Sequence, residues 1–422
     1  MYKDINLDKT KQDAEHFMLE NDRYLYVAFF EELEKYCKIN NIIIGGDIGI
    51  DLLVEKKLNI DSFMWDLYCE NTFNNAKNIA DILYKTKSSH INSRTVAMQT
   101  NIKYKEFTIM INARPFFNIY AIEKYQNISL VKLMAPTLVE SYFTKLKLKV
   151  IPEELQLINI YQNLYSPAKM NLWEERLKNE KIIFEHLSNE QKILITGGRQ
   201  TNKLEIIDKI LKKTIKNTNA IIIGEYALEL LGYEKKPNRL QIITSTTIEE
   251  MIFALNSLLK SNLTFVEYKL NLPRDFRIKK YTIYMQGRDR TPLFDIFNST
   301  NFEMIPFWEI NNYKIGNPFV LLRFQFINLW SLRIILNIGS ESKFIENKIR
   351  VILNRSNKLR RLIDEIISGS NTNYAVTDLF QLDNYIGKYI NEFIAKKQLI
   401  KKIGMRFPIY YPALKDKNEE EK

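Results

Sequence analysis

Residues 41–54 read NIIIGGDIGIDLLV: three consecutive isoleucines, a pair of glycines, and then apolar residues at helical spacing. Residues 219–231 repeat this pattern as NAIIIGEYALELL, with Gly224 at the turn. A short β-branched run that ends in glycine and continues into apolar residues three or four apart predicts a buried strand, a tight turn and a helix. The chain therefore contains the same predicted unit twice.

The segments that follow the two glycine turns also correspond. In the first half, FMWDLYC at 63–69 predicts a strand and 73–84 a helix; in the second half, LQIIT at 240–244 predicts a strand and 248–260 a helix. A further strand, EFTIMIN at 106–112, is expected to precede a long helix near 129–148. Its counterparts are two strands at 281–286 and 292–298, which precede a helix over 317–337.

These correspondences predict an α+β protein with two lobes of one topology. The repeat period is roughly 180 residues, which is too long for a solenoid and typical of a duplicated domain. The expected divisions are a first lobe over 1–150, a helical connector over 151–216, a second lobe over 217–340 and a helical C-terminal extension over 341–422.

Composition excludes several classes of protein. The chain of 422 residues carries a net charge of +11, which favours a polyanionic partner such as a nucleic acid. Its two cysteines cannot build a disulfide framework or a cysteine-based zinc site, and its three histidines are far apart. Residues 1–20 lack the apolar core of a secretion signal, and no uncharged stretch is long enough to cross a membrane, so neither secretion nor a membrane is expected.

A glycine turn beside a strand with carboxylates suggests one chemistry. Glycines let backbone N–H groups approach a triphosphate, and the N-terminus of the next helix favours negative charge. Two carboxylates at positions i and i+2 of a strand point to the same face, where they can share two Mg²⁺ ions. A third carboxylate on a neighbouring strand completes such a metal site.

The residues that make up this pattern resemble a known family. The run IIIGGDIGIDLL, followed by FMWDLYCENTFNNAKNIADILY, resembles the poly(A) polymerases of large nucleocytoplasmic DNA viruses, of the asfarvirus and mimivirus lineages and, more distantly, the poxviruses. The segments LPRDFRIKKYTIYM, LFDIFN, FEMIPF and YKIGNPFVLLRFQFINLW are similar to the degenerate second nucleotidyltransferase lobe of those enzymes. The resemblance covers residues 40–415 and implies transfer of AMP from ATP to an RNA 3′-hydroxyl in mRNA 3′-polyadenylation, with Mg²⁺ or Mn²⁺ as cofactor.

The resemblance also assigns the expected site residues. Gly45 and Gly46 would hold the triphosphate, Arg94 would contact a phosphate, and Asp66 would bind metal as the catalytic carboxylate. The other two carboxylate positions fall on Met64 and Asn112.

A thioether and an amide are poor substitutes for the charged oxygen ligands that Mg²⁺ prefers. The protein is therefore either a poly(A) polymerase with an unusual metal site or an impaired, polymerase-derived pseudoenzyme. In the second lobe Gln241 stands where Asp66 stands in the first, so that lobe is not expected to be catalytic. Asp295 lacks a second acid two residues away, which favours a structural, hydrogen-bonded role.

Two basic runs are candidates for contact with an RNA backbone, although a run of lysines on a helix is commonly a solvated face. The candidate residues are Arg355, Lys358, Arg360, Arg361, Lys401 and Lys402. The family resemblance implies an mRNA 3′ end as substrate, a homodimer or a heterodimer with a sister subunit, and a location in the cytoplasmic viral factory or the virion.

Two other functions stay open from the sequence. The chain could be a structural or assembly protein that binds only protein, or, less attractively, a nucleotidyltransferase that acts on small nucleotides. Salt-sensitive RNA binding would argue against the assembly protein, because phosphate contacts release counterions and weaken as salt rises.

Overall fold

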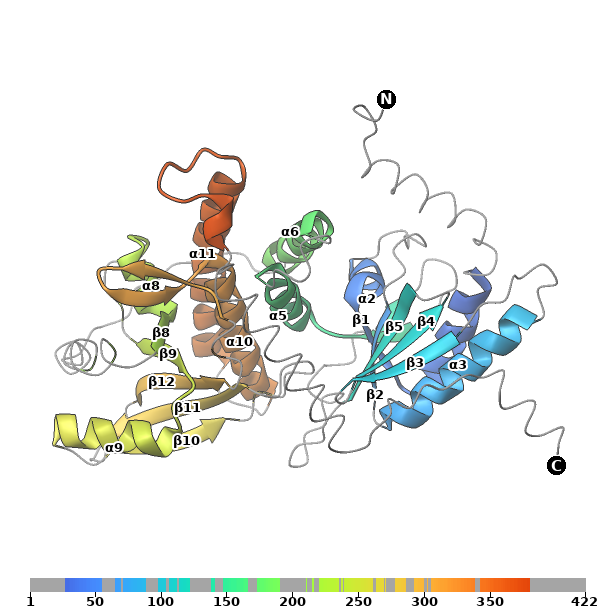
Figure 1. Ribbon diagram of the computed structural model, residues 1–422, viewed down its shortest axis with the longest axis horizontal. Helices are drawn as coiled ribbons and strands as arrows, with labels where there is room; N and C mark the ends of the chain where they lie inside the picture. The colour runs from blue at the N-terminus through green and yellow to red at the C-terminus, as the bar shows by residue number, and fades with distance from the viewer. Residues whose placement is uncertain are drawn as a thin grey trace, which may run out of the picture. The chain divides into compact units, whose positions relative to one another are not determined.

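The structure is a computed structural model in two compact units, one of the described residues up to Pro152 and the other of those from Glu153 onward. It describes residues 27–54, 65–69, 71–88, 98–103, 106–111, 114–121, 138–140, 147–165, 173–189, 210, 215, 220–234, 237, 239–260, 263–268, 270, 278–285, 292–299, 302, 305–337 and 342–379. Each unit contains a seven-stranded mixed sheet with helices beside it (Figure 1).

The first sheet has the strand order β3-β4-β5-β2-β1-β7-β6. Its elements are β1 (Ile43–Gly45), α2 (Gly46–Leu53), β2 (Trp65–Cys69), α3 (Thr72–Ser88), β3 (Met98–Lys103), β4 (Glu106–Ile111), β5 (Arg114–Ala121), β6 (Leu138–Glu140) and β7 (Lys147–Val150). Helical residues 27–39 and α3 supply apolar side chains, among them Phe29, Leu33, Ile79 and Leu83, to the core of this unit.

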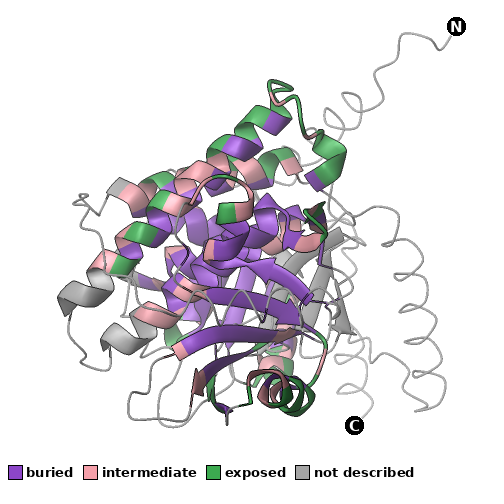
Figure 2. Cartoon of the chain, turned by 90° about the vertical axis from the view of Figure 1, so that its left-hand side faces the viewer, coloured by how far each residue is buried: buried purple, intermediate pink, exposed green. Residues whose placement is uncertain are grey.

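The second sheet has the strand order β10-β11-β12-β9-β8-β14-β13. Its elements are β8 (Ala220–Ile223), α8 (Gly224–Leu230), β9 (Leu240–Thr244), α9 (Ile248–Leu259), β10 (Leu263–Tyr268), β11 (Ile278–Met285), β12 (Pro292–Ser299), β13 (Phe307–Ile310) and β14 (Tyr313–Gly316). In Figure 2 its strands are mostly coloured as buried, whereas α9 buries only Ile248, Met251 and Leu255 and exposes its outer face.

The two sheets have the same topology, strand for strand. In each, the first strand pairs antiparallel with the second and parallel with the seventh, and the fifth strand pairs parallel with the second. Even the register irregularity between the fourth and fifth strands falls at the same place, after Ile109 in one sheet and after Ile283 in the other.

The registers make the lobes comparable residue by residue. A backbone bridge joins Gly46 to Trp65 in the first lobe and Gly224 to Leu240 in the second. The residues that follow Trp65 and Leu240 are Asp66 and Gln241, so these two side chains occupy equivalent positions, as the sequence predicted.

A glycine with positive φ turns each central strand into its helix. The φ angle is 65° at Gly46 and 69° at Gly224, in the left-handed region that a residue with a Cβ adopts only at a cost. Gly45 is needed for a different reason: a Cβ there would lie 2.7 Å from a ring carbon of Tyr68 and 2.9 Å from Ile151. The glycine pair therefore fixes both the direction of the chain and the close packing behind it.

Helices complete the second unit. The long, buried α10 (Pro318–Asn337) packs against α5 (Glu153–Leu164) and α11 (Ser342–Ile367), and α5 packs against α6 (Trp173–Asn189). The start of α10 is fixed by Asn317, whose side-chain oxygen accepts a hydrogen bond of 3.0 Å from the backbone N–H of Val320. The expected connector helices thus pack within the second unit.

One expectation from the sequence is wrong. The sequence predicts a long helix near 129–148, but residues 138–140 form β6 and residues 147 and 148 begin β7. β7 pairs with β1 and β6, and the alternation of lysine with apolar residues over 147–150 follows the period of a strand. Within the helical extension expected over 341–422, α11 is a long helix, and residues 380–422 lie outside the described residues.

The glycine turn of the second lobe gives a test with a matched control. Gly224 and Gly369 have nearly the same backbone φ angle, 69° and 71°. A Cβ at Gly224 would lie 2.3 Å from Oε1 of Gln241, whereas a Cβ at Gly369 would meet nothing within 4 Å. We expect Gly369→Ala to cost about 1 kcal/mol through backbone strain, and Gly224→Ala to cost about 1–3 kcal/mol more. Urea unfolding of the two variants measures the difference, and equal losses would contradict the close packing at Gly224.

Candidate functional site

In the first lobe, the glycine turn, Asp66 and strand β5 come together at one end of the sheet. Asp66 is the second residue of β2, where it lies opposite Gly45 on β1 and opposite Asn118 on the parallel strand β5. The structure thus brings together Gly45, Gly46 and Asp66, three residues that the sequence assigned to one site. Asp66 is buried, and so is Asp47 in the first turn of α2.

The sheet order shows which residue of the neighbouring strand lies level with Asp66. The strand that neighbours β2 is β5, whereas β4, which ends just before Asn112, pairs with β5 and β3. The residue level with Asp66 is therefore Asn118, and sequence reasoning missed it because it passed over β5 as a strand. Asn118, like Asn112, is a neutral amide. Met64, Arg94, Asn112, Lys401 and Lys402 lie outside the described residues.

The donors at these positions do not fit a two-metal site. Of the positions expected from the sequence to hold carboxylates, Asp66 is charged, whereas Met64 and Asn112 are neutral. Within the described residues no group of three or more His, Cys, Asp or Glu side chains is placed to hold a metal ion. Within the described part of the first lobe, Asp66 therefore does not have beside it the further anionic oxygens that two Mg²⁺ ions require.

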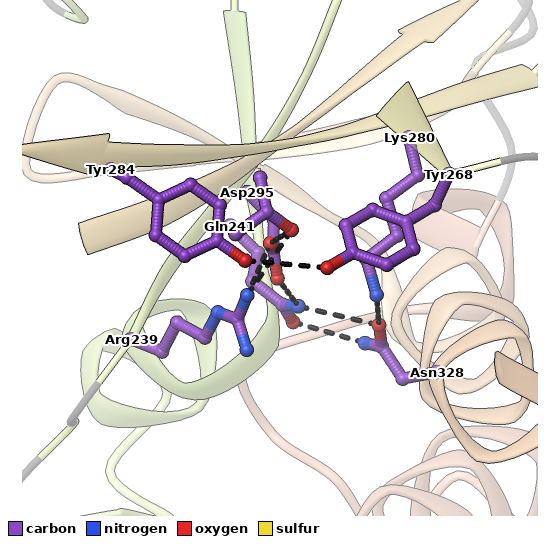
Figure 3. A network of polar contacts seen from close by, with 8 residues as sticks. Arg239, Gln241, Tyr268, Lys280, Tyr284, Asp295 and Asn328 are labelled. Carbon is purple, nitrogen blue, oxygen red and sulfur yellow. Dashed lines mark hydrogen bonds and ion pairs between the residues drawn. The ribbon is translucent and has the colours of Figure 1, made fainter. Parts of the chain in front are cut away.

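The second lobe places a buried polar network at the equivalent point (Figure 3). Its centre is Asp295 on β12, which is fully buried and lies level with Gln241 on β9. Oδ1 of Asp295 accepts hydrogen bonds from Nη2 of Arg239 at 2.5 Å and from the hydroxyl of Thr282 at 2.7 Å. Oδ2 accepts a bond of 2.9 Å from the Gln241 amide. The carboxylate is thereby neutralised by Arg239, just before β9, and hydrogen-bonded also by side chains of β9 and β11.

This network occupies the three ligand positions of the second lobe. Gln241 is equivalent to Asp66 and Asp295 to Asn118, while Arg239, two residues before Gln241, corresponds to Met64. Each lobe thus keeps one carboxylate, in different places. In the second lobe a guanidinium contacts the remaining carboxylate, and the side chain of Gln241 fills the space beside Gly224. The second lobe thus places a cation of the chain itself, Arg239, against its buried carboxylate.

A second cation and an amide extend the network towards α10. Asn328 exchanges hydrogen bonds with Gln241, and it accepts a bond of 3.1 Å from the buried ammonium group of Lys280. Burial alone would raise the pKa of Asp295, but the charges of Lys280 and Arg239 and the bonds from Thr282 and Gln241 hold it below its ordinary value. Burial lowers the pKa of Lys280, and Asp295 offsets part of that shift.

Several basic residues proposed for RNA have partners within the second unit. Arg355 forms ion pairs of 2.9 Å with Glu225 and 3.0 Å with Glu234. Arg360 binds both oxygens of Glu180 and lies over the ring of Phe184. Lys358 donates to the carbonyl of Tyr233, whereas Arg361 is exposed. Arg355 and Arg360 thus join α11 to α8 and α6, and Arg361 is the member of this run that solvent reaches best.

Comparison with solved structures identifies the architecture. The crystal structure of the Megavirus polyadenylate synthase superposes on this chain with a TM-score of 0.62 and 11% sequence identity, over 98% of this chain and 87% of that one. The chain has the fold of a viral polyadenylate synthase.

Sequence comparison finds relatives without an assigned function. Uncharacterized proteins of African swine fever virus, from a South African tick isolate and a Namibian warthog isolate, are each 26% identical over 438 aligned positions. These alignments cover 99% of this chain and 99% of each relative. No protein-family model matches the chain. Among the helices that the structure describes, none is long and apolar enough to cross a membrane.

The central carboxylate of the second lobe is testable by substitution. Asp295→Asn leaves Arg239 and Lys280 without their counter-charge, and we expect it to lower the free energy of unfolding by about 3–5 kcal/mol at pH 7. Asp364→Asn, at an exposed position of α11, should change it by less than about 0.5 kcal/mol. Because the folded-state pKa of Asp295 is depressed, its contribution is complete above the unfolded pKa and is lost as the pH falls through the folded pKa. Urea unfolding over a pH series should therefore show the wild type and Asp295→Asn converging in acid, and a constant gap would refute this role.

Two neighbouring arginines of α11 differ in their contacts: Arg360 pairs with Glu180, whereas Arg361 is exposed. Arg360→Gln breaks a largely buried ion pair and should destabilise the protein by about 2 kcal/mol, whereas Arg361→Gln should cost less than about 0.5 kcal/mol. Thermal unfolding of the two variants measures this contrast. Similar losses in both would show that the pair with Glu180 contributes little.

Proposed function

We propose that this protein acts in viral mRNA 3′-polyadenylation as a catalytically impaired, RNA-binding subunit. The observation that carries the proposal is the disagreement between fold and site. Nearly the whole chain follows the fold of a polyadenylate synthase, yet each lobe retains a single carboxylate at the ligand positions, Asp66 in one and Asp295 in the other. Loss of metal carboxylates removes the charge stabilisation on which AMP transfer depends.

The organisation of the chain supports the rest of the proposal. Identical strand order and register in the two lobes support an origin by duplication. A net charge of +11 supports an RNA partner, with Arg361, Lys401 and Lys402 as backbone contacts. An impaired subunit requires a competent one, so we propose pairing with a sister polymerase subunit or self-association. The viral relatives support action in the cytoplasmic viral factory or the virion.

A tailing assay tests the catalytic part of this proposal. Purified protein is incubated with labelled oligo(A) RNA and ATP, in Mg²⁺ and separately in Mn²⁺, beside the variant Asp66→Asn. We expect the wild type to extend RNA no more than Asp66→Asn does, because one carboxylate cannot hold two metal ions. Extension that is abolished in Asp66→Asn would mean that a complete site exists, and the impaired assignment would be wrong.

RNA retention on a filter tests the binding part. We expect retention at low salt that falls as the salt concentration rises, because phosphate contacts release counterions. Arg361→Gln should weaken it, whereas Lys178→Gln, which removes an exposed charge from α6, serves as the control. Failure to retain RNA at any salt concentration would favour the assembly protein instead.

A further inference from the structure

The second-lobe network holds more positive than negative charge. Arg239 and Lys280 share one buried carboxylate, Asp295, whose oxygens already accept the three hydrogen bonds described above. The ammonium group of Lys280 bonds to the neutral amide of Asn328 rather than to an acid. Lys348 on α11 also interacts electrostatically with Arg239 and Asp295, and with Glu225, which together with Glu234 is paired to Arg355. Within the buried network itself, two cations, Arg239 and Lys280, therefore face one carboxylate, Asp295.

Unbalanced charge in a desolvated place is costly, and a single bound anion would offset it. The network opens to solvent on the side of Arg239, whose side chain is 32% exposed. Nε of Arg239 is buried and makes no hydrogen bond within the described part of the chain. A guanidinium has five N–H donors, and only the Nη2 group of this one bonds to Asp295 and, at 3.4 Å, to Thr282. Donors for a further acceptor are therefore left.

Two tyrosines stand beside this guanidinium (Figure 3). Tyr268 on β10 and Tyr284 on β11 share one hydrogen bond of 3.2 Å between their hydroxyls, so one of the two hydroxyl protons can be donated to another group. Burial and the hydrogen bond shared with Tyr284 raise the pKa of Tyr268 to about 12, so its hydroxyl stays protonated at physiological pH. Along β11, Tyr284 shares the face of Lys280 and Thr282, because alternate residues of a strand point to the same side.

We propose that the second lobe binds a phosphodiester group of RNA directly, without a divalent ion, at Arg239, Tyr268 and Tyr284, with Lys348 at the rim. A phosphodiester carries a single negative charge, which matches the excess of one cation. Its non-bridging oxygens accept hydrogen bonds from guanidinium and hydroxyl groups, as nucleic-acid backbones do in proteins. The choice of RNA as the source of the phosphate rests on the proposed function, whereas the inference that an anion binds here rests on the charges and hydrogen-bond donors of the site alone.

The test measures binding by the full chain in buffer with EDTA, using labelled oligo(A) RNA and, in separate titrations, ATP and inorganic phosphate. Two variants probe the site without removing the buried pair: Tyr284→Phe deletes one hydroxyl, and Lys348→Gln deletes the rim charge. Lys279→Gln is the control, since Lys279 is adjacent to Lys280 on β11 but points to the other face, is exposed, and pairs with Glu267. The three proteins are compared with the wild type by fluorescence anisotropy and by thermal unfolding.

We expect Tyr284→Phe and Lys348→Gln each to weaken RNA binding about fivefold and Lys348→Gln to reduce the salt dependence by about one ion, with Lys279→Gln almost unchanged. Equal losses in Lys348→Gln and Lys279→Gln, or binding that EDTA abolishes and Mg²⁺ restores, would overturn the proposal. Preference for ATP or inorganic phosphate over RNA would overturn RNA as the source while leaving an anion site. Tight RNA binding unaffected by both site variants would refute this site without touching the proposed function, whereas failure to bind RNA at all would contradict both.

Discussion

The backbone turn at the end of each central strand is the constraint on which the rest of both lobes depends. Gly46 and Gly224 adopt positive φ, and this sends the chain from β1 or β8 into a helix while leaving the strand end beside β2 or β9. In the first unit, the end of β1 therefore lies beside β2, which in turn pairs with β5. In the second unit, β8, β9 and β12 are arranged in the same way. Because both sheets have the same order and register, the position of Asp66 and the position level with it on the neighbouring parallel strand recur in the second sheet as Gln241 and Asp295.

What occupies those positions differs, and the difference follows from electrostatics. A metal site needs several negative oxygens, which repel one another until the ion is bound. The second lobe has one such oxygen pair, the carboxylate of Asp295, which forms an ion pair with Arg239. Thr282 and Gln241 donate the other hydrogen bonds that this carboxylate accepts. The first lobe keeps Asp66 between Gly45 and Asn118. Within the described residues, the common fold therefore carries two different charge arrangements.

The sequence predicted local elements well because their signals are local. The Ile-rich strands, the glycine turns and the helices α3, α9 and α10 each follow from periodicity within a few residues. It missed β5, which begins with Arg114-Pro115 and owes its place to β2, and it took the region of β6 and β7 for a helix, because strand pairing is decided by distant residues. The contacts of Gln241 with Asn328 span 87 residues, so no local pattern could have indicated the network.

The guanidinium at the centre of the second lobe has a consequence for how this unit is made. A metal ion must be captured from solution, and a fold completed by one depends on its concentration and is lost to chelators. Arg239 is part of the chain and arrives next to Asp295 at a fixed effective concentration as soon as β9 and β12 pair. The second lobe can therefore complete its polar core during synthesis whatever the supply of divalent ions.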